Sequence, residues 1–144
     1  MSKNYCVGIL YNKTLTELLL LFRLKEPYKG RLNGIGGHVE EGETPGKAMR
    51  RECIEETGID AILNMQHVCT FSYSNGVILN AYALQVDLDN FNEYWDKAVE
   101  EGTLEVFKTD SDLLYDVRQN AFAGDGNLPF IIFEGLNLLR KGMM

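Results

Sequence analysis

The chain of 144 residues is long enough for one domain with a sizeable core. Hydrophobic residues make up 45% of it and charged residues 24%, a globular balance that excludes a disordered or fibrous protein. The formal net charge of −7 argues against a broad nucleic-acid-binding surface, which needs a basic patch. The same charge repels a free phosphate group, so we expect a polyphosphate substrate to meet divalent cations in the site.

The sequence contains no apolar run long enough for a membrane span. The longest such runs, for example Leu18–Phe22, are too short to cross a bilayer, and Met1–Asn4 leads into a strand without a cleavage site. The three cysteines, Cys6, Cys53 and Cys69, are odd in number and lack metal-ligand spacing, so we expect reduced thiols. These features predict a cytoplasmic protein with no membrane partner, and we expect Cys53 to be a small buried residue and not a nucleophile.

The first elements expected along the chain are two aliphatic strands, Tyr5–Tyr11 and Glu17–Leu24, joined by a turn at Asn12–Thr14. Proline, glycine and asparagine predict a loop over Pro27–Gly34. The following segment, Gly34–Gly37, is glycine-rich and allows another group to approach the backbone closely.

A helix is predicted over Pro45–Thr57. Thr44 is a suitable N-cap, proline is favoured at the first helical position, and Gly58 ends the helix. The acidic residue before it, Glu43, complements the helix dipole.

The second half of the chain begins with two long strands, Ala61–Tyr73 and Val77–Asp87, connected by a hairpin at Ser74–Gly76. The elements expected after them are an irregular acidic segment with a helical turn near Trp95 (Asp89–Gly102), a strand (Thr103–Lys108), a short helix (Ser111–Val117), a loop (Gln119–Asn127) and a closing helix (Pro129–Lys141). This order predicts an α+β fold, an α/β/α sandwich whose mixed sheet is packed between helices, in a single domain covering residues 1–144.

Three glutamates on the predicted helix, Glu52, Glu55 and Glu56, fall within about 100° of one side. Like charges at this spacing repel one another and destabilise the helix unless something positive lies before them. A carboxylate cluster without histidine or cysteine suits Mg²⁺, or Mn²⁺, better than zinc. The alternative reading is a solvated acidic face, in which Arg51 only forms an intrahelical pair with Glu55.

The stretch from Gly37 to Ile59 closely resembles the Nudix box, G-x5-E-x7-R-E-U-x-E-E-x-G-U with U apolar. The matching residues are Gly37, Glu43, Arg51, Glu52, Cys53, Glu55, Glu56, Gly58 and Ile59. At Cys53 the family prefers Leu, Val or Ile, a difference that we expect to affect packing and not chemistry. The resemblance implies the Nudix fold and hydrolysis of a diphosphate bond in a nucleoside diphosphate derivative.

Weaker similarities extend beyond the box. The approach Gly30–Gly37 is similar to that of MutT-like enzymes, which clear oxidised purine nucleoside triphosphates. Glu101 lies where many members supply one further metal ligand, although Glu100 is an alternative. Asn127 lies in the segment where bacterial members place a purine-reading asparagine. The implied substrate is therefore a nucleoside triphosphate, which includes oxidised forms such as 8-oxo-dGTP, cut to monophosphate and pyrophosphate.

The resemblance and the chemistry of the side chains together assign roles to individual residues. Glu52 is the first choice for the general base and Glu55 the second, while Arg51 organises the carboxylates. The expected ligands of a Mg²⁺ ion are the carbonyl of Gly36 and the carboxylates of Glu52, Glu55, Glu56 and Glu101. The expected substrate contacts are Arg23, Asn33, Gly37 and Asn127. Arg23 is equally well a plain surface residue, and Asn33 a turn residue.

Other functions remain open. ADP-ribose-cleaving members of the family tend to carry a proline well after the box, and this chain has none between Ile59 and Asn75. Dinucleoside polyphosphates and nucleotide sugars are further possible substrates. A Nudix-fold sensor without catalysis would usually break the box at a glutamate, and a plain acidic interaction domain would leave the glycine turn unexplained. The sequence allows a monomer or a homodimer.

Overall fold

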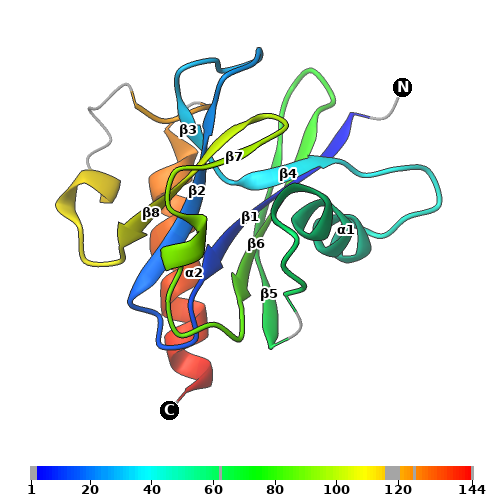
Figure 1. The fold of residues 1–144 in the computed structure, drawn as a ribbon. Coiled ribbons are helices and arrows are strands. Elements are labelled where there is room, and N and C mark those ends of the chain that lie inside the picture. Colours follow the sequence, from blue (N-terminus) through cyan, green and yellow to red (C-terminus); the bar gives the residue numbers. More distant parts are fainter. Residues whose placement is uncertain (1–2, 62, 116–120, 125, 144) are drawn as a thin grey trace.

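The fold is an eight-stranded mixed sheet with one long helix on each face (Figure 1). The computed structural model describes residues 3–61, 63–115, 121–124 and 126–143. The main path of the sheet runs in the order β5-β6-β1-β2-β8-β7, while β3 pairs with β2 and β4 pairs with β1. The neighbours β1 and β6 are parallel, and the other pairs are antiparallel. The predicted sandwich with a mixed sheet is confirmed.

The strands are β1 (Asn4–Tyr11), β2 (Glu17–Arg23), β3 (Leu32–Asn33), β4 (Ile35–His38), β5 (Asn64–Ser72), β6 (Ile78–Gln85), β7 (Lys97–Val99) and β8 (Gly102–Lys108). The helices are α1 (Pro45–Thr57), the 3-10 turns η1 (Asn92–Tyr94) and η2 (Asp112–Tyr115), and α2 (Asn127–Gly142). Within the described residues, no helix is long and apolar enough to cross a membrane.

Two hydrophobic cores lie on opposite faces of the sheet, because successive side chains of a strand point to opposite faces. On β1, Cys6 and Leu10 join the core under α1, whereas Val7, Ile9 and Tyr11 join the core under α2. Strands β2 and β6 divide their side chains in the same way. Central strands that are apolar on both faces therefore fix a three-layer arrangement.

Helix α1 begins and ends as the sequence predicts. The Thr44 side chain accepts a hydrogen bond from the Lys47 N–H at 3.3 Å, and Pro45 occupies the first turn. Gly58 ends the helix in the left-handed region, with a φ of 77°. The helix buries Cys53 against the sheet, which confirms it as a small core residue.

Three short strands were not expected. The glycine-rich segment predicted as an approachable turn forms β4, which pairs along β1, and the end of the predicted loop forms β3. The irregular segment contains β7, which pairs with β8, as well as the turn η1 next to Trp95. These segments lack strand propensity of their own, and they are extended because a neighbouring strand offers them hydrogen bonds.

Some predicted boundaries were also wrong. Strand β5 begins at Asn64 and not at Ala61. Helix α2 begins at Asn127, so this residue belongs to the first helical turn and not to the preceding loop. The predicted helix Ser111–Val117 is a 3-10 turn over Asp112–Tyr115 in its described part, and its last two residues lie outside the described residues.

Candidate active site

The glutamates of α1 lie around a cavity between the helix and the β7–β8 turn. The cavity has a volume of about 320 Å³, and its lining residues are Glu52, Glu55, Glu56, Val99, Glu100 and Glu101. Five of these six residues carry a carboxylate. The fold thus brings the box glutamates together with the downstream pair that the sequence singled out, and both Glu100 and Glu101 reach the cavity.

Glu56 is the most deeply placed carboxylate of this group. Its Oε2 is buried and has no hydrogen-bond partner among the described residues. Burial and the nearby charge of Glu52 raise the pKa of Glu56 to about 8, although a backbone hydrogen bond from Gly36 opposes the shift. A buried, unsatisfied carboxylate oxygen is costly, so the site is incomplete without a proton or a cation.

Glycines on β4 let the helix and the carboxylates come close. A Cβ on Gly36 would lie 2.0 Å from the carbonyl oxygen of Cys6, because β4 crosses β1 there without room for a side chain. A Cβ on Gly37 would lie 2.6 Å from Oε1 of Glu52. The requirement for glycine at these two positions is therefore steric: one permits strand pairing, and the other leaves space for a carboxylate.

Arg51 joins the loop before α1 to the carboxylates of the helix. Its guanidinium donates two hydrogen bonds to Glu43, at 2.8 and 3.0 Å, and one to the backbone oxygen of His38 at 3.0 Å. It also donates to Glu52 at 3.0 Å and to Glu55 at 3.3 Å. The predicted pair with Glu55 exists, but Glu43 is the principal partner, and Arg51 holds the pKa of Glu43 down at about 2. Arg51 therefore contacts three glutamates of the motif, and its role as an organiser of the site stays a prediction.

Glu52 combines partial burial with this ion pair. Burial raises its pKa above the ordinary value, and Arg51 opposes that rise. The side chain of Glu52 is 14% exposed, whereas that of Glu55 is 58% exposed. Of the two candidate bases, Glu52 is the one sheltered from bulk solvent.

Arg23 lies at the end of β2 and pairs with Glu101. Its Nη2 donates to Oε2 of Glu101 at 3.1 Å, and its Nε donates to the backbone oxygen of Pro27 at 2.7 Å. The side chain of Arg23 is 15% exposed, so the alternative of a plain surface residue is wrong.

The carboxylates line the same cavity, but their oxygens are not grouped around a single position in the described part of the chain. Among the described residues, no three His, Cys, Asp or Glu side chains are gathered closely enough to hold a metal ion as they stand. Three of these carboxylates are paired with arginines: Glu52 and Glu55 with Arg51, and Glu101 with Arg23. The donor set nevertheless fits a hard divalent cation, since it consists of carboxylate oxygens and includes the unsatisfied oxygen of Glu56.

The two candidate base-reading asparagines have local partners. Oδ1 of Asn33 accepts a hydrogen bond from the N–H of Gly34 at 2.8 Å, which is the behaviour of a turn residue. Nδ2 of Asn127 donates to the hydroxyl of Tyr73 at 2.9 Å. A contact of Asn33 or Asn127 with a base therefore remains a prediction.

The aromatic side chains of β5, β6 and α2 fall into two groups by exposure. Tyr82 is buried in the core under α1. Phe71 and Phe130 pack edge to face with ring centroids 6.4 Å apart, and Phe130 is 50% exposed. Only the second group offers a ring surface to a ligand.

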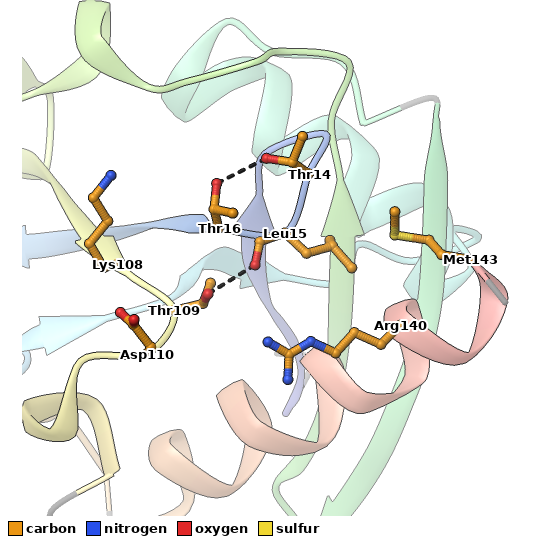
Figure 2. Close-up of a pocket in the computed structure, with 8 residues that line it drawn as sticks. All are labelled: Thr14, Leu15, Thr16, Lys108, Thr109, Asp110, Arg140 and Met143. Carbon is orange, nitrogen blue, oxygen red and sulfur yellow. Dashed lines mark hydrogen bonds between the residues drawn. The ribbon is translucent and has the colours of Figure 1, made fainter.

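A larger cavity, of about 480 Å³, lies at the other end of β2 (Figure 2). Its lining residues are Thr14, Leu15, Thr16, Lys108, Thr109, Asp110, Arg140 and Met143. Its wall contains one carboxylate and two basic side chains, so it lacks grouped oxygen ligands for a hard cation. We therefore assign the chemistry to the smaller cavity.

Sequence reasoning missed the strongest contact of the site. Glu43 was read as a complement to the helix dipole, but its carboxylate is the anchor of Arg51 eight residues later. The spacing of the two residues in the box was the available signal. The pairing itself depends on the loop that folds back over the start of α1.

The comparisons with known proteins agree with this geometry. The family model for the NUDIX domain matches residues 3–95. A mutator MutT protein from Bacillus halodurans is 22% identical, with a TM-score of 0.64 over 92% of this chain and 81% of that chain. The protein DR0079 from Deinococcus radiodurans is 21% identical, with a TM-score of 0.62 over 90% of this chain and 80% of its own. The NUDIX domain of Shewanella oneidensis NrtR, solved in complex with ADP ribose, is 16% identical, with a TM-score of 0.64 over 98% of this chain and 88% of that chain.

A mixed sheet between two helices with a carboxylate cavity beside the first helix defines the class of the Nudix-fold proteins. The chain belongs to the NUDIX domain family, as the match over residues 3–95 shows. Solved MutT proteins share its fold at 18% and 22% identity. The family acts on small nucleotide substrates and uses divalent metal ions.

Proposed function

We propose that the chain, as a single domain over residues 1–144, is a Mg²⁺-dependent hydrolase of nucleoside triphosphates, with oxidised purine forms such as 8-oxo-dGTP among its substrates. The reaction adds water across one phosphoanhydride bond and releases a nucleoside monophosphate and pyrophosphate. Mn²⁺ is an alternative cation of the same chemistry.

One observation carries this proposal, the buried Oε2 of Glu56 that has no partner among the described residues. A solvated acidic helix face would leave every carboxylate oxygen in water. Here the deepest oxygen is desolvated inside a wall of five carboxylates, which is an arrangement that favours cation binding over a free anion.

The carboxylates of Glu52, Glu55, Glu56 and Glu101, with the carbonyl of Gly36, would hold the cation. When bound, the cation neutralises the negative charge of the phosphate oxygens as the anhydride bond breaks. Glu52 accepts the proton of the attacking water, and its sheltered position and raised pKa suit that role. Glu55 is the second choice for this base. Arg51 stays protonated and holds the carboxylates of Glu52 and Glu55 in position through hydrogen bonds.

The proposed substrate contacts lie outside the set of residues that lines the carboxylate cavity. The backbone of Gly37 is one of them, beside the Glu52 carboxylate. Arg23 contributes a positive charge next to Glu101, one of the lining residues. The exposed ring of Phe130, next to Asn127 on the first turns of α2, suits a base with a planar face and a polar edge. Asn33 remains a further candidate for the base edge.

ADP-ribose is a second candidate substrate. The NUDIX domain of Shewanella oneidensis NrtR has a similar fold and was solved with ADP ribose bound, at 16% identity to this chain. A nucleotide sensor that binds such a ligand without hydrolysis is the corresponding non-enzymatic function. The complete set of charged box residues, from Glu43 to Glu56, favours hydrolysis over sensing.

The test is product release from a panel of compounds in the presence and absence of Mg²⁺. The panel contains common and 8-oxo nucleoside triphosphates, ADP-ribose, a dinucleoside polyphosphate and a nucleotide sugar. Wild type is compared with Glu56→Gln and with Glu41→Gln, an exposed glutamate outside the motif positions. We expect metal-dependent turnover of a triphosphate that is lost in the first variant and kept in the second. Preferred turnover of ADP-ribose would replace the proposed substrate, and binding without any turnover would favour the sensor.

A further inference from the structure

Arg23 forms an ion pair with Glu101, one of the residues that line the carboxylate cavity. The N–O distance is 3.1 Å, and the side chains are only 15% and 33% exposed. The backbone holds both partners in place, because Arg23 is paired with Gly102 across β2 and β8 and the N–H of Leu24 donates to the carbonyl of Glu101 at 3.0 Å. The pair is therefore built into the sheet and is not a chance contact between two long surface side chains.

Glu101 has two competing attractions in this position. Its carboxylate lines the cavity together with Glu52, Glu55 and Glu56, where a cation would neutralise the group. In the structure, one of its oxygens is instead occupied by Nη2 of Arg23. A divalent cation and a guanidinium cannot both satisfy this oxygen fully, so metal binding weakens the ion pair.

Arg23 likewise has two alternative acceptors, the carboxylate of Glu101 and a phosphate oxygen of the substrate. Its Nε is fixed by the carbonyl of Pro27 at 2.7 Å, which keeps the guanidinium in place when Glu101 turns away. The N–H groups of the freed Nη2 then have no acceptor, and the positively charged guanidinium can donate to a phosphate oxygen. In the metal-free protein the same donor is occupied, and an incoming phosphate has to displace a carboxylate.

We propose that the Arg23–Glu101 pair is a latch that couples the cation to the phosphate of the substrate. The cation takes Glu101, and this transfer releases Arg23 to bind phosphate. Because coupling of two binding equilibria is reciprocal, phosphate on Arg23 also makes Glu101 more available to the cation. This inference rests on the proposed function for the identity of the two ligands, but not on any catalytic step.

Glu100 provides a matched control. It lines the same cavity and carries the same charge, but within the described part of the chain it has no ion pair with Arg23 or with any other base. Neutralising Glu100 removes one negative charge from the cavity without opening the latch. Neutralising Glu101 does both.

The experiment measures binding of inorganic pyrophosphate by calorimetry in EDTA, so that no metal takes part. We expect Glu101→Gln to bind pyrophosphate about 5- to 150-fold more tightly than wild type, the range typical of such coupling. We expect a change of about 2-fold or less for Glu100→Gln, the size of a screened, unpaired surface charge. In an Arg23→Gln background, Glu101→Gln should give no more than the effect of Glu100→Gln.

Equal gains for Glu100→Gln and Glu101→Gln would overturn the latch, because charge alone would then explain them. An unchanged gain in the Arg23→Gln background would also overturn it. Circular dichroism of each variant establishes that it is folded, and Arg23→Lys, which keeps the charge but loses the fork of donors, provides a second background with an intermediate effect expected.

A further readout separates the latch from the proposed function. The Nε–H signal of Arg23 in an NMR spectrum should shift on addition of Mg²⁺ in wild type and stay in place in Glu101→Gln. A latch that responds to metal and pyrophosphate in a protein without turnover would leave this inference intact and remove the proposed hydrolysis. Turnover with no difference between the two glutamate variants would do the reverse.

Discussion

Replacing Glu56 with Gln should stabilise the metal-free protein while abolishing its metal-dependent activity. The wild-type carboxylate is buried, and one of its oxygens has no partner among the described residues. The folded protein therefore prefers the protonated side chain, and the pKa is raised to about 8 from 4.5. A carboxyl group whose pKa is raised on folding favours the folded state below pH 4.5, and this contribution is lost as the pH rises through 8.

The size of the effect follows from the two pKa values. One pKa unit is worth about 1.4 kcal/mol, so the shift from 4.5 to about 8 corresponds to at most about 5 kcal/mol between pH 4 and pH 9. Water in the open cavity lowers this figure, and we expect the Gln variant to gain about 2 to 4 kcal/mol over wild type at pH 9. At pH 4 the two proteins should be nearly equal in stability.

The assay is urea denaturation in EDTA at pH 4, 7 and 9, with Glu41→Gln as the control for removal of an exposed carboxylate. Mg²⁺ at 1,000 times its Kd should offset the lead of the Gln variant at pH 9, because a ligand at that concentration stabilises the protein that binds it by about 4.1 kcal/mol. A wild-type stability that does not fall from pH 7 to pH 9 relative to the Gln variant would refute the reasoning. The same holds if the Gln variant gains as much from Mg²⁺ as wild type.

Three further substitutions test the parts around this carboxylate. Arg51→Lys loses the forked contact with Glu43 and should reduce metal affinity by about 10- to 100-fold, as measured by Mn²⁺ titration. An unchanged affinity would contradict the organising role of Arg51. Gly37→Ala should displace the carboxylate of Glu52, which lies 2.6 Å from the added Cβ. Because this carboxylate ends a flexible side chain, we expect a cost of only about 1 kcal/mol in urea denaturation but a clear loss of turnover, so wild-type turnover would show that the space is not needed. Tyr11→Phe removes a buried hydrogen bond to a carbonyl of α2 and should lower the free energy of unfolding by about 1 kcal/mol. Calorimetry should show a Tm lower by about 3 °C, with kcat unchanged. A fall in kcat would mean that α2 is coupled to the site.

The sequence determined those parts of the fold that depend on local pattern. Helix α1 has the predicted bounds, Pro45–Thr57, because a threonine cap, a proline at the first turn and a terminal glycine are all local signals. Strands β1, β2 and β8 were also expected nearly as they are, since β1 and β2 are mostly aliphatic and β8 contains Leu104, Val106 and Phe107. The box identified the helix that we propose to be catalytic for the same reason: its glutamates lie within one stretch of the chain.

Tertiary structure alone decided which residues from distant parts of the chain are in contact. Strands β4 and β7 exist because β1 and β8 offer them hydrogen bonds, and no local propensity predicts this. The pairing of Arg23 with Glu101 joins residues 78 positions apart, and it changes the meaning of Arg23 from a free phosphate contact to a partner of a carboxylate. Sequence spacing along one helix reports angular position about one axis, whereas contacts between elements depend on sheet register and loop path, and these are set by the packing of the whole domain.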